Sequence, residues 1–117
     1  MTQPQTIDLP AVYVGTTWEG INSIELDQPN GDPLDLTNAQ LSMTYRRVGG
    51  FQNELVLGIG SGIALTNAAA GIARVNSQVL PLTPGTFYWE MILTHPTLGV
   101  VPLFVGTQEI TRIGVNT

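Results

Sequence analysis

The fold is indicated most clearly by the stretch Phe87-Tyr88-Trp89-Glu90-Met91-Ile92-Leu93-Thr94. Its odd-numbered positions are large and apolar, and they alternate with a less apolar set. Alternation with a period of two is the pattern of a β-strand whose two faces lie in different surroundings. The stretch therefore predicts a strand that turns Phe87, Trp89, Met91 and Leu93 into a core.

Working outward from this strand, the same period recurs in shorter runs that are closed by turn residues. Leu41 and Met43 belong to the apolar phase of one run, Trp18 to that of another, and Val101, Leu103 and Val105 form a third. Short strands at this spacing predict an all-β sandwich or barrel. The candidate strands are 7–14, 17–28, 39–48, 54–59, 62–66, 72–76, 86–94, 100–105 and 108–113. The predicted core side chains are Trp18, Leu41, Met43, Phe87, Trp89, Met91 and Leu93.

One segment, Ile63 to Val75, also permits a helical interpretation because it contains three consecutive alanines, which are good helix formers. Several glycines bracket it, and we favour two short strands joined by a turn with Gly71 at a positive φ. A single helical turn is the alternative.

The length of 117 residues and the 43% hydrophobic content support one domain with a real core. We expect a polar N-terminal arm over residues 1–6 and a single β-sandwich domain over residues 7–117. The chain has no cysteine, which excludes disulfides and thiolate metal sites. The one histidine, His95, leaves no partner for a multi-histidine metal centre, so no metal and no cofactor are expected.

The charge balance argues against several classes of partner. With 9 acidic and 4 basic residues the net charge is -5, and all four basic residues are arginine. Nucleic acids and anionic membranes attract basic surfaces, so we expect the chain to bind neither. No apolar run approaches the roughly 20 residues of a membrane-spanning helix, and Met1 to Thr6 is too polar for a signal peptide. We therefore expect synthesis in a cytoplasm without export.

Two motifs suggest ligand sites but have simpler explanations. Gly58-Ile59-Gly60-Ser61-Gly62 resembles a phosphate cradle, but no long helix follows it, so a loop is favoured. Asp27, Asp32 and Asp35 flank a Pro-Asn-Gly turn and offer oxygen ligands to calcium. Their spacing lacks the order of a dedicated calcium loop, and turn chemistry is favoured over a weak cation site.

Catalytic residues are not evident either. The glutamates include no pair that the sequence places in one cleft, and alternation places Glu90 on an outward face. His95 precedes Pro96 in a loop, where an exposed structural role is favoured over a general base. Trp18 and Trp89 fall on the apolar phase of their strands, so core packing is favoured over sugar stacking. We expect the chain not to be an enzyme.

The most specific local signal is Leu82-Thr83-Pro84-Gly85-Thr86-Phe87-Tyr88. Pro84 fixes φ at the second position of a turn, and Gly85 supplies the positive φ that a type II turn needs at its third. The segment resembles the L-x-P-G-T-x-Y entry into a late strand of fibronectin type III and related immunoglobulin-like sandwiches.

A resemblance over about Leu9 to Ile113 rests on an ordered series of short stretches. The series is Val14-Gly15-Thr16-Thr17-Trp18, Asp35-Leu36-Thr37-Asn38-Ala39, Tyr45-Arg46-Arg47, Ala70-Gly71-Ile72, Leu82 through Leu93, and Gly106-Thr107-Gln108-Glu109-Ile110. It is similar to small immunoglobulin-like proteins of tailed bacteriophages, such as the N-terminal domain of baseplate upper proteins. The resemblance implies an immunoglobulin-like antiparallel β-sandwich and a structural component of the virion. It implies no catalytic residue and no cofactor.

The expected function is a non-enzymatic structural subunit in the tail, baseplate or fibre-attachment region of a phage. One alternative is a capsid-surface decoration or head-fibre subunit. Another is a carbohydrate-binding module that uses exposed aromatics such as Tyr13, Phe51 or Phe104. Only 11% of the residues are charged, and interface cores are depleted in charge. We therefore expect a symmetric homo-oligomer that contacts other virion proteins, with Ile92, Val100 and Phe104 as candidate interface residues.

Overall fold

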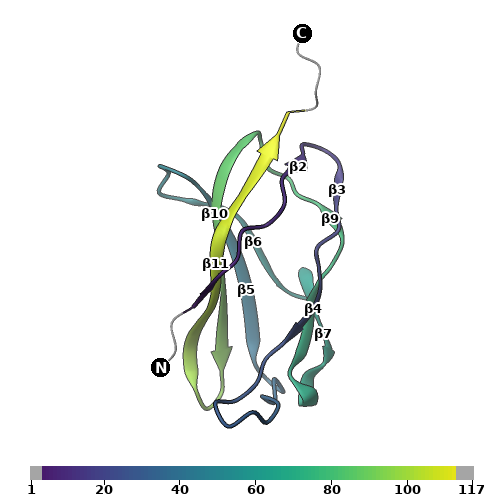
Figure 1. The fold of residues 1–117 in the computed structure, drawn as a ribbon, viewed down its shortest axis with the longest axis vertical. Helices are drawn as coiled ribbons and strands as arrows, with labels where there is room; N and C mark the ends of the chain where they lie inside the picture. Colours follow the sequence, from purple (N-terminus) through teal and green to yellow (C-terminus); the bar gives the residue numbers. More distant parts are fainter. Residues whose placement is uncertain (1–3, 113–117) are drawn as a thin grey trace.

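The computed structural model describes residues 4–112 and consists almost entirely of β-strands (Figure 1). The strands are β1 (Gln5–Thr6), β2 (Val12–Tyr13), β3 (Thr17–Trp18), β4 (Ile21–Glu25), β5 (Gln40–Arg47), β6 (Asn53–Ile59), β7 (Gly62–Asn67), β8 (Ile72–Val75), β9 (Gln78–Val79), β10 (Gly85–His95) and β11 (Gly99–Thr111). Within the described residues the one helical element is η1, a single 3-10 turn over Ala68–Ala70. No helix in this part of the chain has the length and apolar character needed to cross a membrane. The predicted all-β class is confirmed.

One curled sheet contains most of the strands, in the order β1-β11-β10-β5-β6-β7-β8-β4, and β2 also pairs with β11. β3 and β9 form a separate two-stranded sheet. The large sheet is mixed rather than purely antiparallel, because β1 and β2 run parallel to β11 and β6 runs parallel to β7. The parallel contact of β6 with β7 is limited to two residue pairs, Gly58 with Gly62 and Ile59 with Ile63, where the chain bends at Gly60 and Gly62 with positive φ. The segment Gly58-Ile59-Gly60-Ser61-Gly62 thus connects two strands, which agrees with the loop favoured for it over a phosphate cradle.

The core lies inside the curl of the sheet, and every predicted core side chain is within it. Trp18, Leu41, Met43, Phe87, Trp89, Met91 and Leu93 are each at most 5% exposed. Tyr45 is buried beside them and donates a hydrogen bond of 2.6 Å to Oε1 of Gln108, while Nε2 of Gln108 donates to the carbonyl of Pro10 at 3.0 Å. Burial raises the pKa of the Tyr45 phenol, so it remains a donor. This buried polar chain ties the N-terminal segment to the sheet.

The N-terminal region follows the edge of β11 instead of forming the single long strand expected over 7–14. The amides of Ile7, Leu9 and Val14 donate to carbonyls of β11, but only Val12–Tyr13 forms a strand there. Pro10 lacks an N–H and interrupts the ladder. The predicted arm of residues 1–6 also joins the sheet where it is described, since Gln5–Thr6 is β1. Residues 1–3 of that arm lie outside the described residues.

The candidate strand 108–113 is not separate from 100–105, because β11 runs without a break from Gly99 to Thr111. Its register against β10 shifts between Met91 and Ile92, which pair with Phe104 and Pro102 respectively. Leu103 is thus an extra residue, a β-bulge, and a bulge reverses which side chains face the core. The expectation that Phe104 faces outward is therefore wrong. It lies opposite buried Met91 and packs against the core.

Two predicted turns have different outcomes. Gly71 has a φ of 74°, which confirms the positive φ expected there, and it follows the 3-10 turn η1, so the helical alternative also describes part of the segment. The type II turn at Pro84-Gly85 is wrong. Gly85 has the expected positive φ, but its value of 152° is far from the roughly 80° of a type II turn. Gly85 already pairs with Ile110 as the first residue of β10. Nη1 of Arg47 donates to the carbonyl of Pro84 at 2.9 Å and fixes this segment instead.

Candidate functional site

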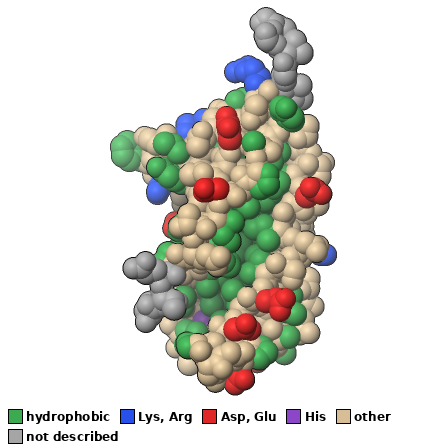
Figure 2. All heavy atoms as spheres, viewed as in Figure 1, with side chains coloured by type: hydrophobic (Ala, Val, Ile, Leu, Met, Phe, Trp, Pro, Cys, Tyr) green, Lys and Arg blue, Asp and Glu red, His purple; other side chains and the backbone are tan. Residues whose placement is uncertain are grey.

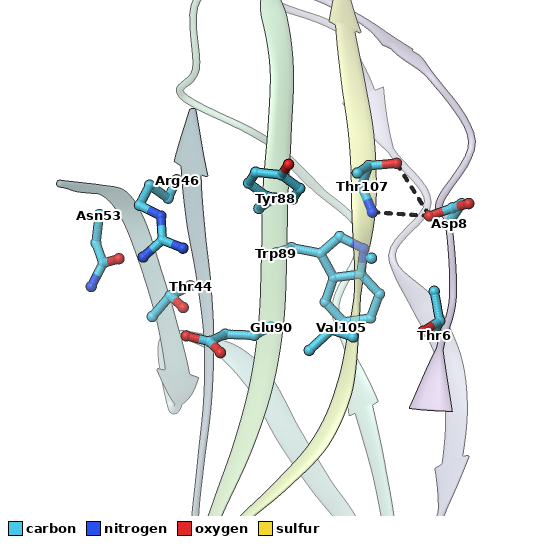
Figure 3. A pocket seen from close by; sticks show the side chains of 11 residues that line it. Thr6, Asp8, Thr44, Arg46, Asn53, Tyr88, Trp89, Glu90, Val105 and Thr107 are labelled. Carbon is cyan, nitrogen blue, oxygen red and sulfur yellow. Dashed lines mark hydrogen bonds between the residues drawn. The ribbon is translucent and has the colours of Figure 1, made fainter. Parts of the chain in front are cut away.

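A hollow of about 380 Å³ lies on the outer face of the large sheet, across β5, β10 and β11 (Figure 3). The register of the strands builds it as two rows of side chains. Arg46, Tyr88 and Thr107 lie directly opposite one another in the first row. Thr44, Glu90 and Val105 make up the second row in the same way, two residues along each strand. The outer phase of three adjacent strands therefore forms the floor of the hollow.

The two ends of the hollow come from segments far apart in the sequence. Asn53 at the start of β6 pairs with Arg46 and closes one end. Thr6 and Asp8 of the N-terminal segment close the other, as Figure 3 shows. Oδ1 of Asp8 accepts hydrogen bonds from the amide and the hydroxyl of Thr107 at 3.1 and 3.2 Å. This contact holds the N-terminal segment at the rim.

Most polar side chains of the hollow make no hydrogen bond within the described part of the protein. The side chains of Thr44, Arg46, Asn53, Tyr88 and Glu90 make no hydrogen bond to another described residue, and the ion pair found in residues 4–112 joins Arg47 to Glu54 instead. The Tyr88 side chain is 48% exposed. The hollow thus presents donors, acceptors and one aromatic ring to solvent.

Trp89 adds an unusual feature behind this face. Trp89 itself borders the hollow, but its indole, 1% exposed, lies on the core side of the sheet and reaches from β10 to β11 (Figure 3). The Nε1 atom is buried and has no hydrogen-bond partner in the described structure. A buried donor without a partner is costly, and such groups usually have a functional or a solvent-related reason. The indole fits here because its cross-strand neighbour is Gly106, which has no side chain.

The residues singled out for ligand chemistry do not form a metal centre. In residues 4–112 no three His, Cys, Asp or Glu side chains lie close enough to hold a metal ion. The Asp32 side chain accepts from the side-chain amide of Asn30, and the backbone of Asp27 forms an isolated antiparallel β-bridge with Pro33. Asp35 accepts from the hydroxyl and the amide of Thr37, and these hydrogen bonds lower the pKa of its carboxyl. The carboxylates of Asp32 and Asp35 are therefore used within their own turns.

His95 has a structural position in the β10–β11 hairpin. Its Nδ1 accepts from the amides of Thr97 and Leu98 at 3.1 and 3.2 Å. Because Nδ1 accepts, the proton is assigned to Nε2, which then donates to the carbonyl of Asp35 at 2.9 Å. The ring joins two loops at one end of the molecule.

The aromatics and interface residues proposed from the sequence are dispersed. Tyr13 is exposed on β2 and Phe51 is 97% exposed at the β5–β6 hairpin, so they do not share a site, and Phe104 packs against the core. Of the candidate interface residues, Ile92 is half-buried on the outer face and Val100 is 65% exposed near the β10–β11 hairpin.

Sequence reasoning missed the hollow itself. The polar phases of β5 and β10 were visible as alternation, and Tyr88 was the signal that could have led to it. Val105 and Thr107 were hidden because the bulge at Leu103 changes the phase of β11. Comparison of the chain with protein-family models, with curated protein sequences and with solved structures finds no match.

Proposed function

We propose that this chain is a non-enzymatic structural subunit of a bacteriophage virion, in the tail, baseplate or fibre-attachment region. In this proposal it forms a symmetric homo-oligomer and contacts other virion proteins. The fold that goes with it is an immunoglobulin-like β-sandwich. The proposal depends on the ordered sequence resemblance, on the strand order and on the distribution of exposed apolar side chains.

The strand order supports the immunoglobulin-like part of the proposal. In immunoglobulin-type sandwiches the central strands divide into a C-F-G sheet and a second sheet that contains B, E and D. The antiparallel run β5-β10-β11 matches the first order, and β4-β8-β7 matches the second, with the strands in the same sequence along the chain. The short parallel contact of β6 with β7 joins these halves into one curled sheet.

The observation that carries the structural role is the presence of exposed apolar side chains on two hairpins at opposite ends of the molecule. Val48 and Phe51 lie in or beside the β5–β6 hairpin, and Leu98 and Val100 lie in or beside the β10–β11 hairpin. Figure 1 shows these hairpins far apart. Figure 2 shows a central stripe of hydrophobic side chains with acidic side chains scattered around it. Exposed apolar side chains that cluster mark interaction sites, and a protruding aromatic is a typical anchor.

The test is mass spectrometry of purified particles of the phage that encodes the chain, with wild-type and variant proteins. The wild-type chain is expected in the particles at a fixed ratio to a major structural protein. Phe51→Ser and Val100→Ser are expected to reduce incorporation, whereas Val79→Ser, an exposed apolar position on β9, keeps it. Absence of the wild-type chain from the particles would contradict the proposal.

A further inference from the structure

We propose that the outer-face hollow between Asn53 and Asp8 binds a neutral saccharide, with Tyr88 as the ring against which a sugar packs. This inference goes beyond the structural role, because it concerns a different surface from the two apolar hairpins. It stands on the lining of the hollow, on its charge and on its volume.

The lining matches the chemistry of a sugar, whose hydroxyl groups both donate and accept. Arg46 offers a guanidinium that only donates, and Glu90 offers a carboxylate that accepts. Asn53 and Thr44 can do both, and none of these four side chains is engaged elsewhere in the described structure. A ligand that lacks either donors or acceptors would leave part of this set without a partner, which costs binding free energy.

Tyr88 supplies the apolar part of the site. Sugars carry C–H groups on the faces of their rings, and an aromatic face is apolar with a slightly negative potential that suits them. Figure 3 shows Tyr88 in the first row of the hollow, between Arg46 and Thr107. Its half-exposed ring is thus flanked by hydrogen-bonding groups on both sides.

The charge of the hollow selects against anions. Its one cationic side chain, Arg46, is accompanied by two carboxylates, Asp8 and Glu90, and the whole chain has a net charge of -5. A phosphate or another anion would meet a net negative site, whereas a neutral polyol would not. The volume of about 380 Å³ also falls within the roughly 300–1,000 Å³ usual for small-molecule sites.

The position of the hollow on strands makes it preorganised. Its floor comes from three long paired strands, and sites on such elements hold their geometry better than sites on loops. The buried Nε1 of Trp89 lies directly behind this floor without a partner. A Cβ on Gly106 would meet both this nitrogen and the carbonyl oxygen of Ile7, so Nε1 lies beside the N-terminal segment. Its resonance should therefore respond to a change at the N-terminal rim, where Asp8 is tied to Thr107.

The experiment is a two-dimensional ¹⁵N–¹H NMR titration of the full chain with maltotriose, cellotriose and triacetylchitotriose, and separately with inorganic phosphate. Titration to about 10 mM detects complexes as weak as millimolar. At least one trisaccharide is expected to give saturable shifts at the amides of Tyr88, Glu90 and Thr107. The indole resonance of Trp89 is expected to move while that of Trp18, on another strand, stays unchanged.

Three variants make the result specific to the hollow. Tyr88→Ala is expected to weaken binding about three- to tenfold, whereas Tyr88→Phe keeps the ring and stays within about twofold of wild type. Tyr13→Ala removes an exposed aromatic outside the hollow and should leave binding unchanged. The proposal is overturned if none of the three trisaccharides binds, if the shifts lie outside the hollow, if phosphate binds in their place, or if Tyr88→Ala binds as wild type.

Discussion

β10 and β11 are antiparallel neighbours of similar length, yet only one of them follows its alternation from end to end. β10 keeps Phe87, Trp89, Met91 and Leu93 on the core face without interruption. β11 changes phase at Leu103, so that Phe104 faces the core and Val105 faces the hollow. The comparison teaches that one extra residue, Leu103, decides which side chains of β11 face the core and which face the surface.

The largest expected effect is the loss of the Trp89 side chain from the inner face of β10. Trp89→Ala should lower the free energy of unfolding by about 3–5 kcal/mol, because it empties a large and well-packed site. That is a large part of a total stability of about 5–15 kcal/mol. Urea unfolding measures it, with Tyr88→Ala on the opposite face as the control expected below about 1 kcal/mol. A cost below about 1 kcal/mol for Trp89→Ala would place the indole at the surface.

The next effect concerns Gly106, the residue of β11 that faces Trp89. A Cβ there would overlap the carbonyl oxygen of Ile7 and lie 2.9 Å from Nε1 of Trp89. Gly106→Ala should therefore cost about 2–3 kcal/mol, as overpacking does. Hydrogen exchange should become faster at the amides of Ile7 and Leu9, which bond to β11.

A matched glycine provides the control for Gly106. Gly58 also lies in a strand, and a Cβ there would make only an ordinary contact, 3.7 Å from the carbonyl oxygen of Leu41. Gly58→Ala is expected to change stability by less than about 0.5 kcal/mol. Equal effects of the two substitutions would contradict the close approach of the N-terminal segment to Gly106.

A smaller effect is expected at Gly85, where β10 begins. A Cβ would overlap Nη1 of Arg47, whose guanidinium also lies 4.6 Å from the ring centroid of Phe87. Gly85→Ala should cost about 1–2 kcal/mol, within the range for local strain. The physical cause differs from the type II turn that the sequence suggests.

The double variant separates the two causes at Gly85. If Arg47 is the obstacle, Gly85→Ala should cost clearly less when Arg47 is replaced by methionine, and thermal melts of the four proteins give the coupling free energy. An unchanged cost in the Arg47→Met background would show that the backbone alone requires glycine.

Alternation predicts those parts of the molecule in which local sequence decides the structure. It correctly predicts β5, β10 and all seven core residues. In β5 and β10 one face is buried in the core and the other is not, so the side chains alternate clearly. It misses the bulge at Leu103, since Val101, Leu103 and Val105 alternate as an unbroken strand would. It also misses the parallel pairing of Gln5–Thr6 with β11, because that contact joins residues about a hundred positions apart.

The hollow was beyond prediction for the same reason. Its residues come from five segments of the chain. Only the order of the strands in the sheet places Asn53 at one end of the hollow and Asp8 at the other. Tyr88 is outward by alternation, but nothing in the sequence shows which side chains flank it. The apolar hairpins were partly visible, since Val100 was singled out, whereas the full exposure of Phe51 depends on the shape of the β5–β6 hairpin.

The central claim, the change of phase in β11, is tested most directly by the free energies of unfolding of Phe104→Thr and Val105→Thr in urea. Threonine favours strands at both positions, so the difference reports which side chain faces the core. We expect Phe104→Thr to cost at least about 1 kcal/mol more than Val105→Thr, because only Phe104 packs against the core. A larger cost for Val105→Thr, or equal costs, would show that β11 keeps one phase and that Val105 does not face the hollow.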